Sequence, residues 1–302
     1  MAEPMTGSRL LTPLQRRLLR WYGRRGRANL PWRAQPSPYR TVVSESMLAQ
    51  TQVERVIPKF ESFVRRFGDF AALAAASPAD VLREWKGLGY NSRALRLRDL
   101  AKAVMERHAG ALPTQLDALL ALPGIGPYSA AAIRAFAFNI DDAPVDTNVA
   151  RIVSRVVFGV EHRSGAPPQT LVEHARRLVP RRRAHDWSSA LMDLGAAVCT
   201  ARAPRCLICP LKQDCAAAPV APEPAQRARQ RVPFERTTRY ARGRIIDRLR
   251  DLPAGRRISL LDLHGQLETT LQHSPEELRG IVDDLQRDGL VHCNGESVAL
   301  PE

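Results

Sequence analysis

Four cysteines crowd into one short stretch of the chain and could together bind a metal. Cys199, Cys206, Cys209 and Cys215 have the spacing C-x6-C-x2-C-x5-C. Thiolates are soft ligands, and four of them can hold either zinc or an iron–sulfur cluster. In a chain without a secretion signal, such clustering indicates a metal site rather than disulfides. The spacing alone does not choose the metal. The separate Cys293 is expected to be a buried apolar residue.

Two carboxylates stand where acid–base chemistry could use them. Glu45 lies inside an otherwise apolar helical stretch, and Asp146 directly precedes another helical stretch. Each also has a simpler interpretation, because Glu45 could be a partly exposed helix residue and Asp146 a helix N-cap. A catalytic pair would need split roles, with one carboxyl donating a proton and the other staying ionised. These two residues alone do not decide between the interpretations.

A glycine-rich turn separates two further helical stretches. Leu-Pro-Gly-Ile-Gly occupies residues 122–126, so Gly124 and Gly126 permit a tight turn and a close approach of backbone to a ligand. The next helix is expected to begin near Pro127, and its free N–H groups would form an anion site suited to a DNA phosphate. Taken alone, the motif equally describes an ordinary connection between two helices.

The elements that must position these residues are predicted to be helices. Apolar residues recur at helical spacing over 11–23, 41–51, 78–88, 93–108, 116–122, 128–137, 148–157, 170–179 and 187–199. Pro58 predicts a kink or boundary near Val56–Ile57. Convincing β-alternation is absent over the first 215 residues, so the body is predicted to be mainly α.

The composition changes after the cysteines and predicts a second domain. Residues 216–231 are rich in Ala, Pro, Gln and Arg and read as a linker between domains 1–215 and 232–302. The final domain shows three helical patterns, the third starting with a capping sequence at Ser274–Glu277, and then a hairpin around Asn294-Gly295. This order predicts a small winged-helix-like α+β domain. It could be a structural cap on the body or an extra contact to DNA or a partner.

Charge and hydropathy narrow the class of protein. The formal net charge of +14 over 302 residues favours a polyanionic partner, although a solvated basic surface would give the same excess. No apolar run approaches the length that spans a bilayer, and Met1–Arg9 lacks an apolar signal core. We therefore expect a cytoplasmic protein with no membrane partner.

Together, these residues resemble the adenine-specific mismatch DNA glycosylases (the MutY type) of the endonuclease III, or helix-hairpin-helix, superfamily. The resemblance covers about residues 30–215. It is carried, in order, by Leu30–Arg33, Ser44–Gln52, Trp85–Tyr90, Leu122–Tyr128, Val145–Val149, Met192–Ala196 and the four cysteines. It implies a two-lobed α fold with the active site in the cleft, and a [4Fe–4S] cluster on Cys199, Cys206, Cys209 and Cys215.

The resemblance also implies a role for each chemical group. Glu45 matches the general acid that protonates the extruded adenine, which would require a raised pKa in a desolvated pocket. Asp146 matches the ionised carboxylate that stabilises the oxocarbenium charge on the sugar. Tyr128 matches a tyrosine beside that sugar, where strand-cutting relatives carry a Schiff-base lysine. The expected reaction is therefore glycosidic cleavage alone, which leaves an abasic site.

The expected partner is double-stranded DNA that carries A·8-oxoguanine or A·G mispairs, bound by a monomer. Gln50 matches the wedge that enters the base stack. Further DNA contacts are expected at Gly124, Gly126, Arg27, Trp32 and Leu48.

The chain departs from the family at three places. Ser189 stands where a pocket glutamine is common, and Asn91 replaces a tyrosine of the usual Gly-Leu-Gly-Tyr-Tyr run. The family's usual C-terminal domain, which reads 8-oxoguanine, is replaced by the short tail.

Two alternatives remain open. The same fold could remove thymine or uracil from mismatches with guanine, although the Glu45 and Asp146 pair favours adenine. A redox-sensing regulator that binds DNA would leave both carboxylates and the glycine-rich turn unexplained.

Overall fold

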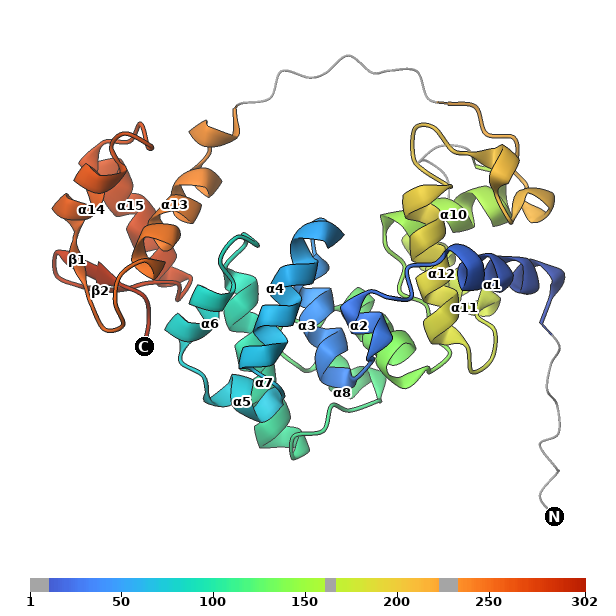
Figure 1. Cartoon of the computed structure of the whole chain (residues 1–302), viewed down its shortest axis with the longest axis horizontal. Coiled ribbons are helices and arrows are strands. Elements are labelled where there is room, and N and C mark those ends of the chain that lie inside the picture. The colour runs from blue at the N-terminus through green and yellow to red at the C-terminus, as the bar shows by residue number, and fades with distance from the viewer. Residues whose placement is uncertain (1–10, 161–166, 223–232) are drawn as a thin grey trace. The chain divides into compact units, whose positions relative to one another are not determined.

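The computed structural model describes residues 11–160, 167–222 and 233–302. Its internal contacts divide the chain into two compact units. The first unit comprises Met1–Val42, Thr114–Ala121 and Ile125–Gln226, and the second comprises Val43–Pro113, Leu122–Gly124 and Arg227–Glu302. Helices dominate the described residues, which confirms the predicted mainly α fold (Figure 1).

The first unit is built of helices from both ends of its sequence. They are α1 (Pro13–Arg25), α2 (Pro31–Ala34), α8 (Leu116–Leu120), α9 (Pro127–Ala132), a π-helical turn (Ile133–Ala137), α10 (Thr147–Phe158), α11 (Pro168–Leu178) and α12 (Ala184–Ala197). Two short 3-10 turns follow at Cys206–Ile208 and Lys212–Asp214.

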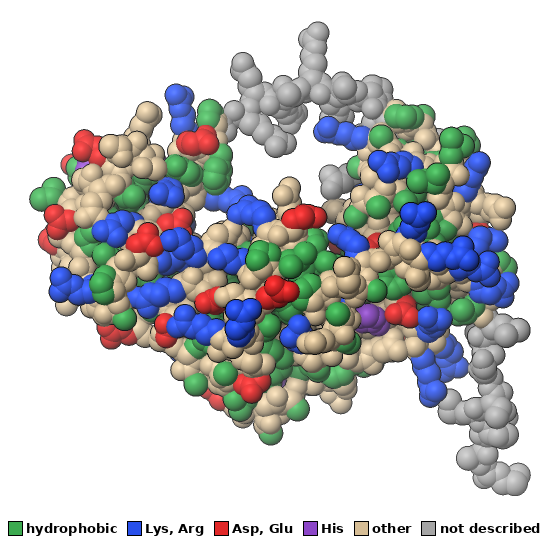
Figure 2. All heavy atoms as spheres, viewed as in Figure 1, with side chains coloured by type: hydrophobic (Ala, Val, Ile, Leu, Met, Phe, Trp, Pro, Cys, Tyr) green, Lys and Arg blue, Asp and Glu red, His purple; other side chains and the backbone are tan. Residues whose placement is uncertain are grey.

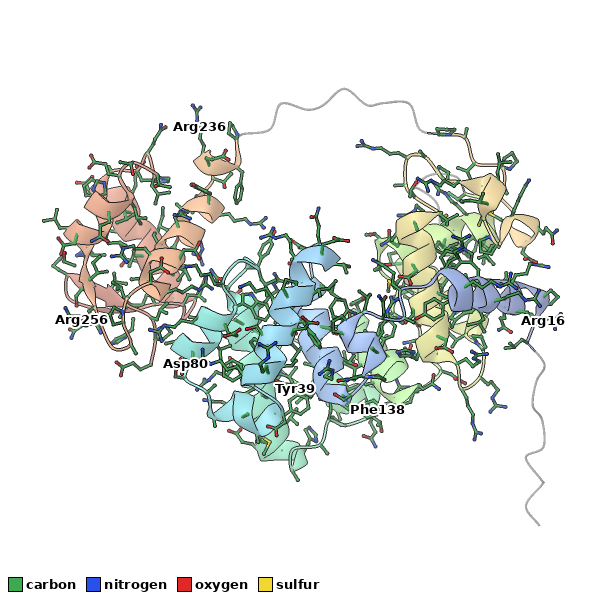
Figure 3. All side chains as sticks on the ribbon, in the orientation of Figure 1. Arg16, Tyr39, Asp80, Phe138, Arg236 and Arg256 are labelled. Carbon is green, nitrogen blue, oxygen red and sulfur yellow. The ribbon has the colours of Figure 1, made fainter. Side chains whose placement is uncertain are left out.

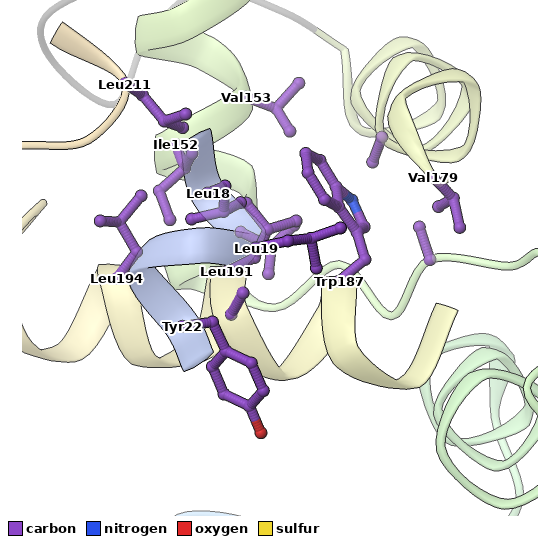
Figure 4. Close-up of a cluster of buried hydrophobic side chains, with 14 of the residues drawn as sticks. Leu18, Leu19, Tyr22, Ile152, Val153, Val179, Trp187, Leu191, Leu194 and Leu211 are labelled. Atoms are coloured by element: carbon purple, nitrogen blue, oxygen red, sulfur yellow. The ribbon is translucent and has the colours of Figure 1, made fainter. Parts of the chain in front are cut away.

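A buried apolar cluster holds this unit together. Leu18 of α1, Ile152 of α10 and Trp187 of α12 each have at most 2% of their surface exposed, and they pack into one core (Figure 4). Burying a side chain of this size stabilises a fold by about 1.5–3 kcal/mol. The first helix is therefore fixed to the segment that leads into the four cysteines.

The second unit contains the middle of the chain and its C-terminal tail. Its helical body consists of α3 (Pro38–Leu48, whose first residues belong to the other unit), α4 (Val53–Arg66), α5 (Phe70–Ala75), α6 (Pro78–Glu84) and α7 (Ser92–His108). Phe63 and Trp85 are fully buried, and their rings pack edge to face with 6.0 Å between the ring centroids.

The boundary predicted from Pro58 is wrong, because α4 runs unbroken from Val53 to Arg66. Proline removes one N–H donor and crowds the preceding turn. Val56, Phe60 and Phe63 are all fully buried on one side of this helix. Their burial on both sides of the proline outweighs the loss of a single backbone hydrogen bond.

The tail, residues 233–302, has the predicted three helices and hairpin. Its elements are a 3-10 turn (Phe234–Arg236), α13 (Thr238–Arg250), β1 (Ile258–Ser259), α14 (Leu260–Leu267), α15 (Pro275–Arg287), β2 (His292–Asn294) and β3 (Ser297–Ala299). The strands form an antiparallel sheet in the order β1-β3-β2. Strand β1 was not predicted, because two residues are too few to show an alternating pattern.

Two local predictions in the tail can be compared with the structure. Ser274 and Glu277 form the predicted capping box at the start of α15. The hairpin turn lies one residue later than predicted: Asn294 pairs with Ser297, so Gly295 and Glu296 form the tip, with Gly295 at φ +60°. Cys293 is half-buried rather than fully buried.

Arg250 fastens the tail to the body of the second unit. This guanidinium is almost wholly buried and donates to the Leu82 carbonyl and to Asn91 Oδ1, both at 2.7 Å. It also pairs with Asp247 at 2.8 Å. Burial lowers the pKa of Arg250, and the two carboxylates Asp247 and Asp251 act against that effect. Asn91, a departure from the family pattern, therefore has a structural role as an acceptor for the tail.

The predicted linker is only partly described. Ala217 and Val220 are buried, and the N–H groups of Ala216 and Ala217 donate to carbonyls of α10, so this first part packs on the helix. Residues 223–232 lie outside the described residues, and the division into domains 1–215 and 232–302 stays a prediction. In the ranges that the structure covers, no helix is long and apolar enough to cross a bilayer.

Candidate active site

Asp146 is the N-cap of α10, as the simpler interpretation of its sequence predicted. Its Oδ1 accepts the N–H groups of Asn148 at 2.9 Å and Val149 at 2.7 Å. Its Oδ2 accepts Nδ2 of the Asn148 side chain at 3.0 Å. Three N–H donors and the positive end of a helix dipole thus surround a half-buried carboxylate. The cap fixes the orientation of the carboxylate before any ligand binds.

A network behind Asp146 holds the Asn148 side chain in place. Arg151 donates to Asn148 Oδ1 at 2.8 Å and to the Gly195 carbonyl at 2.9 Å. It also donates to the Cys199 carbonyl at 2.8 Å. Desolvation lowers the pKa of Arg151, although the nearby Cys199 and Asp146 oppose this. One arginine therefore links the carboxylate's support to the first of the four cysteines.

Gly195 provides the space that this network needs. A Cβ atom at this position of α12 would lie 2.7 Å from Asn148 Cβ and 3.3 Å from Asn148 Cγ. Real Cβ contacts are essentially never as short as 2.7 Å. The absence of a side chain at Gly195 therefore allows Asn148 to reach Asp146.

Glu45 lies on α3, in the second unit, beside a run of buried residues. Met47 is fully buried and Ser44 has 1% of its surface exposed, whereas Glu45 is half-buried. Leu48, also half-buried, ends the helix, and the exposed Gln50 follows it with φ +59°. A left-handed backbone is uncommon for a residue other than glycine and marks a turn held by its surroundings.

Arg93 of α7 is the group that holds this turn. Its guanidinium donates to the carbonyls of Ser46 at 2.8 Å and Ala49 at 2.5 Å. It also donates to the carbonyls of Leu88 and Gly89, each at 3.2 Å. Desolvation is the main cause that lowers the pKa of Arg93. The Gln50 turn and the Gly87–Tyr90 turn are therefore tied to one side chain.

The glycine-rich turn has the predicted geometry. Gly124 has φ +76°, and Gly126 caps α9 with Pro127 at its first position. Tyr128, the second residue of α9, has 37% of its surface exposed. The first N–H groups of α9 have no acceptor within the helix, as at any helix start, and such groups can bind an anion.

Of the two side chains of the first unit that were expected at DNA, Arg27 has a partner within that unit and Trp32 is buried. Arg27 and Arg33 pair with the same carboxylate, Asp193, at 2.7 and 2.9 Å. Burial acts to raise the pKa of Asp193, but Arg33 and Arg27 outweigh it and hold that pKa below its usual value. Trp32, on α2, has 8% of its surface exposed. Arg27 is thus already paired with Asp193, so any contact with DNA would have to use the donors that this ion pair leaves over.

The four cysteines of the predicted metal site line one cavity. Arg155, which is 2% exposed, lies among them and donates to the carbonyls of Thr200 at 2.8 Å and Ala201 at 3.0 Å. Burial raises the pKa of the Cys209 thiol to about 11 and also raises that of Cys215. Within the described residues, no three His, Cys, Asp or Glu side chains converge closely enough to hold a metal ion.

The donor chemistry nevertheless fits a thiolate cluster. Every metal-ligating side chain that lines the cavity is a cysteine, and the cations Arg155, Arg205 and Lys212 line it too. These cations would offset the negative charge of four thiolates, of which those of Cys209 and Cys215 form against a raised pKa. The cysteines therefore suit a metal centre that prefers soft ligands.

The two units share out the predicted site residues. The first unit contains Asp146, Tyr128, Gly126, Arg27, Trp32 and the four cysteines. The second unit contains Glu45, Leu48, Gln50 and Gly124. Sequence reasoning missed the supporting residues Asn148, Arg151, Arg93 and Asp193. Asn148 lies in the family motif Val145–Val149 and Asp193 in the motif Met192–Ala196, so the resemblance could have pointed to them. Arg151 and Arg93 lie in none of the family motifs.

Comparisons with known proteins identify relatives of this chain. The family model described as "HhH-GPD superfamily base excision DNA repair protein" matches residues 43–181. The chain is 40% identical over 279 residues to an adenine DNA glycosylase of Mycolicibacterium smegmatis, which covers 91% of each chain. It is 41% identical over 257 residues to an adenine DNA glycosylase of Mycobacterium tuberculosis, covering 83% of this chain and 82% of that one.

A solved structure shares the fold. A thermostable thymine-DNA glycosylase matches with a TM-score of 0.62 and 29% identity, over 67% of this chain and 93% of that one.

Proposed function

The chain belongs to the HhH-GPD superfamily of base excision DNA repair proteins, and we propose that it removes adenine mispaired with 8-oxoguanine or guanine in duplex DNA. The observation that carries the proposal is the 40% identity to a named adenine DNA glycosylase over 91% of both chains. That span is longer than the family model and reaches beyond the helical body. The thymine or uracil alternative is not favoured by these relatives.

The reaction is hydrolysis of one N-glycosidic bond. Adenine is a poor leaving group unless it is protonated, so Glu45 gives a proton to the base as the bond to C1′ breaks. The electron pair of that bond leaves with adenine, and positive charge develops on the sugar. Water then adds to C1′ and gives a proton to the Glu45 carboxylate, which restores the acid and leaves an abasic site and free adenine.

Asp146 is assigned to the developing charge on the sugar. Its carboxylate is oriented by three N–H donors before substrate arrives, so it need not reorganise during the reaction. Tyr128, at the start of α9, is assigned to the reacting sugar. Because it cannot form a Schiff base, the proposed enzyme leaves the DNA strand uncut.

DNA is held by groups of both units. The N–H groups beside Gly124 and Gly126 take a backbone phosphate, and Gln50 fills the space that the extruded base leaves. Lys and Arg side chains, spread over the face in Figure 2, provide the general attraction to DNA. One monomer suffices, since each proposed group comes from this chain.

Cys199, Cys206, Cys209 and Cys215 are proposed to hold a [4Fe–4S] cluster. When bound, the cluster would cross-link the loop Cys199–Cys215 and would take no part in the reaction itself. Through Arg151, which bonds to the Cys199 carbonyl and to Asn148, the fixed loop supports the position of Asp146.

An excision assay with Glu45→Gln tests the acid–base role. We expect the rate of adenine release from an A·8-oxoguanine duplex to fall by about 100-fold or more, because glutamine cannot donate the proton. Glu54→Gln, an exposed position of α4 with the same loss of charge, is the matched control. Release is measured by alkali cleavage of the abasic strand under single-turnover conditions. A wild-type rate in Glu45→Gln would refute the assignment.

The base specificity is tested with four duplexes that contain A·8-oxoguanine, A·G, T·G and U·G. The proposal expects release of adenine from the first two. Strong cleavage at T·G with none at A·8-oxoguanine would establish the alternative instead.

A further inference from the structure

A basic cavity lies within the second unit, where the tail meets the Gly87–Tyr90 turn. It has a volume of about 570 Å³. This is within the range of sites that bind small ligands or single nucleotides, which is roughly 300–1,000 Å³. None of its lining residues has a role in the proposed reaction.

The charge of the cavity is one-sided. Its lining includes five arginines, Arg55, Arg239, Arg242, Arg244 and Arg250, and one carboxylate, Asp247. Some of these arginines have structural partners: Arg250 is buried, Arg242 pairs with Asp288, and Arg55 donates to the Gly87 carbonyl.

Two exposed arginines keep donors for a ligand. Among the described residues, the ion pair of Arg244 is a long contact of 3.8 Å to Asp247. Arg239 pairs with no carboxylate of the described residues. Its guanidinium lies 3.8 Å from the centre of the Tyr90 ring. An arginine stacked in this way keeps its edge free for a phosphate.

Aromatic rings line the same space. Phe234 has 51% and Tyr90 39% of its surface exposed, and Arg239 lies against both rings. Tyr240 contacts Phe234 edge to face at 5.5 Å, which supports the exposed ring. Exposed aromatic faces beside free guanidinium groups are the combination that binds unstacked bases and their phosphates.

The cavity is tied to the proposed wedge. Arg93 bonds to the carbonyls of the Gln50 turn and to Leu88 and Gly89, which precede Tyr90. Arg93 also lies 5.5 Å from the Tyr90 ring, on which Arg239 stacks. The path from Gln50 to the tail therefore consists of direct contacts within one unit.

We infer that the cavity formed by Phe234, Arg239, Arg244 and the Gly87–Tyr90 turn binds a locally unpaired DNA strand, with an unstacked base against Phe234 and phosphates on Arg239 and Arg244. The tail is then a second DNA-binding element next to the wedge. The inference rests on the proposed action on DNA but not on which base is removed.

Fluorescence anisotropy with the full-length protein tests the inference. The labelled probes are a single-stranded oligodeoxynucleotide, a duplex with one bulged nucleotide and a fully paired duplex. We expect Arg239→Ala combined with Arg244→Ala to weaken single-strand binding by about tenfold and to reduce the salt dependence, because phosphate contacts are lost. We expect Phe234→Leu to weaken binding of the single-stranded and bulged probes about fivefold, with paired-duplex binding unchanged.

Arg256→Ala is the matched control. Arg256 is an exposed arginine of the same tail that does not line the cavity, and Figure 3 shows it at the other end of the tail from Arg236. It should bind all three probes as the wild type does. The inference is overturned if the double variant behaves like Arg256→Ala, or if Phe234→Leu affects all three probes equally. Competition by free deoxynucleoside monophosphate at the same phosphate concentration would also overturn it, because that indicates a nucleotide site instead of a strand site.

The adenine excision rate, measured with saturating enzyme, separates the two proposals. If the wild type excises no adenine but the cavity variants lose DNA binding as expected, the proposed function fails and the inference stands. If excision occurs and the cavity variants bind normally, the inference alone fails.

Discussion

Gly195→Ala is the substitution that most directly tests the support of Asp146. The new methyl group would lie 2.7 Å from Asn148 Cβ and 3.4 Å from Ile152 Cδ1. To reach an ordinary contact of 3.4 Å, Asn148 must move by about 0.7 Å. That movement would lengthen or break the bond from Asn148 Nδ2 to Asp146 Oδ2, now 3.0 Å long.

The structure sets the size of both expected effects. Overpacking a buried site costs about 1–3 kcal/mol, and replacing a helical glycine with alanine returns about 1 kcal/mol. Gly195→Ala should therefore destabilise the protein by at most about 2 kcal/mol and leave it folded. A displacement of about 1 Å in a catalytic group can cost about 100-fold in rate, so we expect adenine excision to fall by about 10- to 100-fold.

Gly280→Ala is the matched control, because it is an exposed helical glycine whose added Cβ meets nothing within 4 Å. It should raise stability by about 0.5–1 kcal/mol and leave excision unchanged. Urea unfolding and single-turnover excision are measured for both variants. If folded Gly195→Ala excises adenine as fast as Gly280→Ala, the idea that Asn148 positions Asp146 is refuted.

Two further predictions concern stability and the cluster. Asp193→Asn should destabilise the protein by about 3 kcal/mol, because two arginines lose a buried partner. Asp186→Asn is the control on the same helix: the Asp186 side chain is 40% exposed, so its loss should cost about 1 kcal/mol or less. Because the pKa of Asp193 is lowered by folding, its stabilisation is present above about pH 4 and is lost as the pH falls, so urea midpoints of the wild type and Asp193→Asn should converge in acid. Cys209→Ser should lose bound iron and visible absorbance in purified protein, while Cys293→Ser, outside the cavity, should retain both; equal iron content in the two variants would contradict the four-cysteine site.

Local signals were read correctly from the sequence because their physics is local. A capping box such as Ser274–Glu277 needs only four residues, and the turn at Gly124 needs only a glycine that tolerates positive φ. The helix boundary that Pro58 suggested is absent because the burial of Val56, Phe60 and Phe63 against the rest of the fold outweighs a local rule. The same limit applies to strand β1, which exists only because a later strand pairs with it.

The candidate site divides in the same way. The family resemblance pointed to Glu45 and Asp146 as candidates, but the sequence did not indicate which residues hold them in place. Arg151 and Arg93 act through contacts 44 to 48 residues away in the chain, and arginines are too common here to stand out. Such long-range hydrogen bonds follow from the fold and could not be read before it.

Arg93 has a consequence for motion. A single guanidinium shares its donors between the Gln50 turn and the Gly87–Tyr90 turn, so opening either turn breaks hydrogen bonds made by the same side chain. The two turns should accordingly form one cooperative opening unit in hydrogen exchange. Gln50, which is proposed to enter the base stack, and the Gly87–Tyr90 turn at the cavity of the tail would then move together when DNA binds.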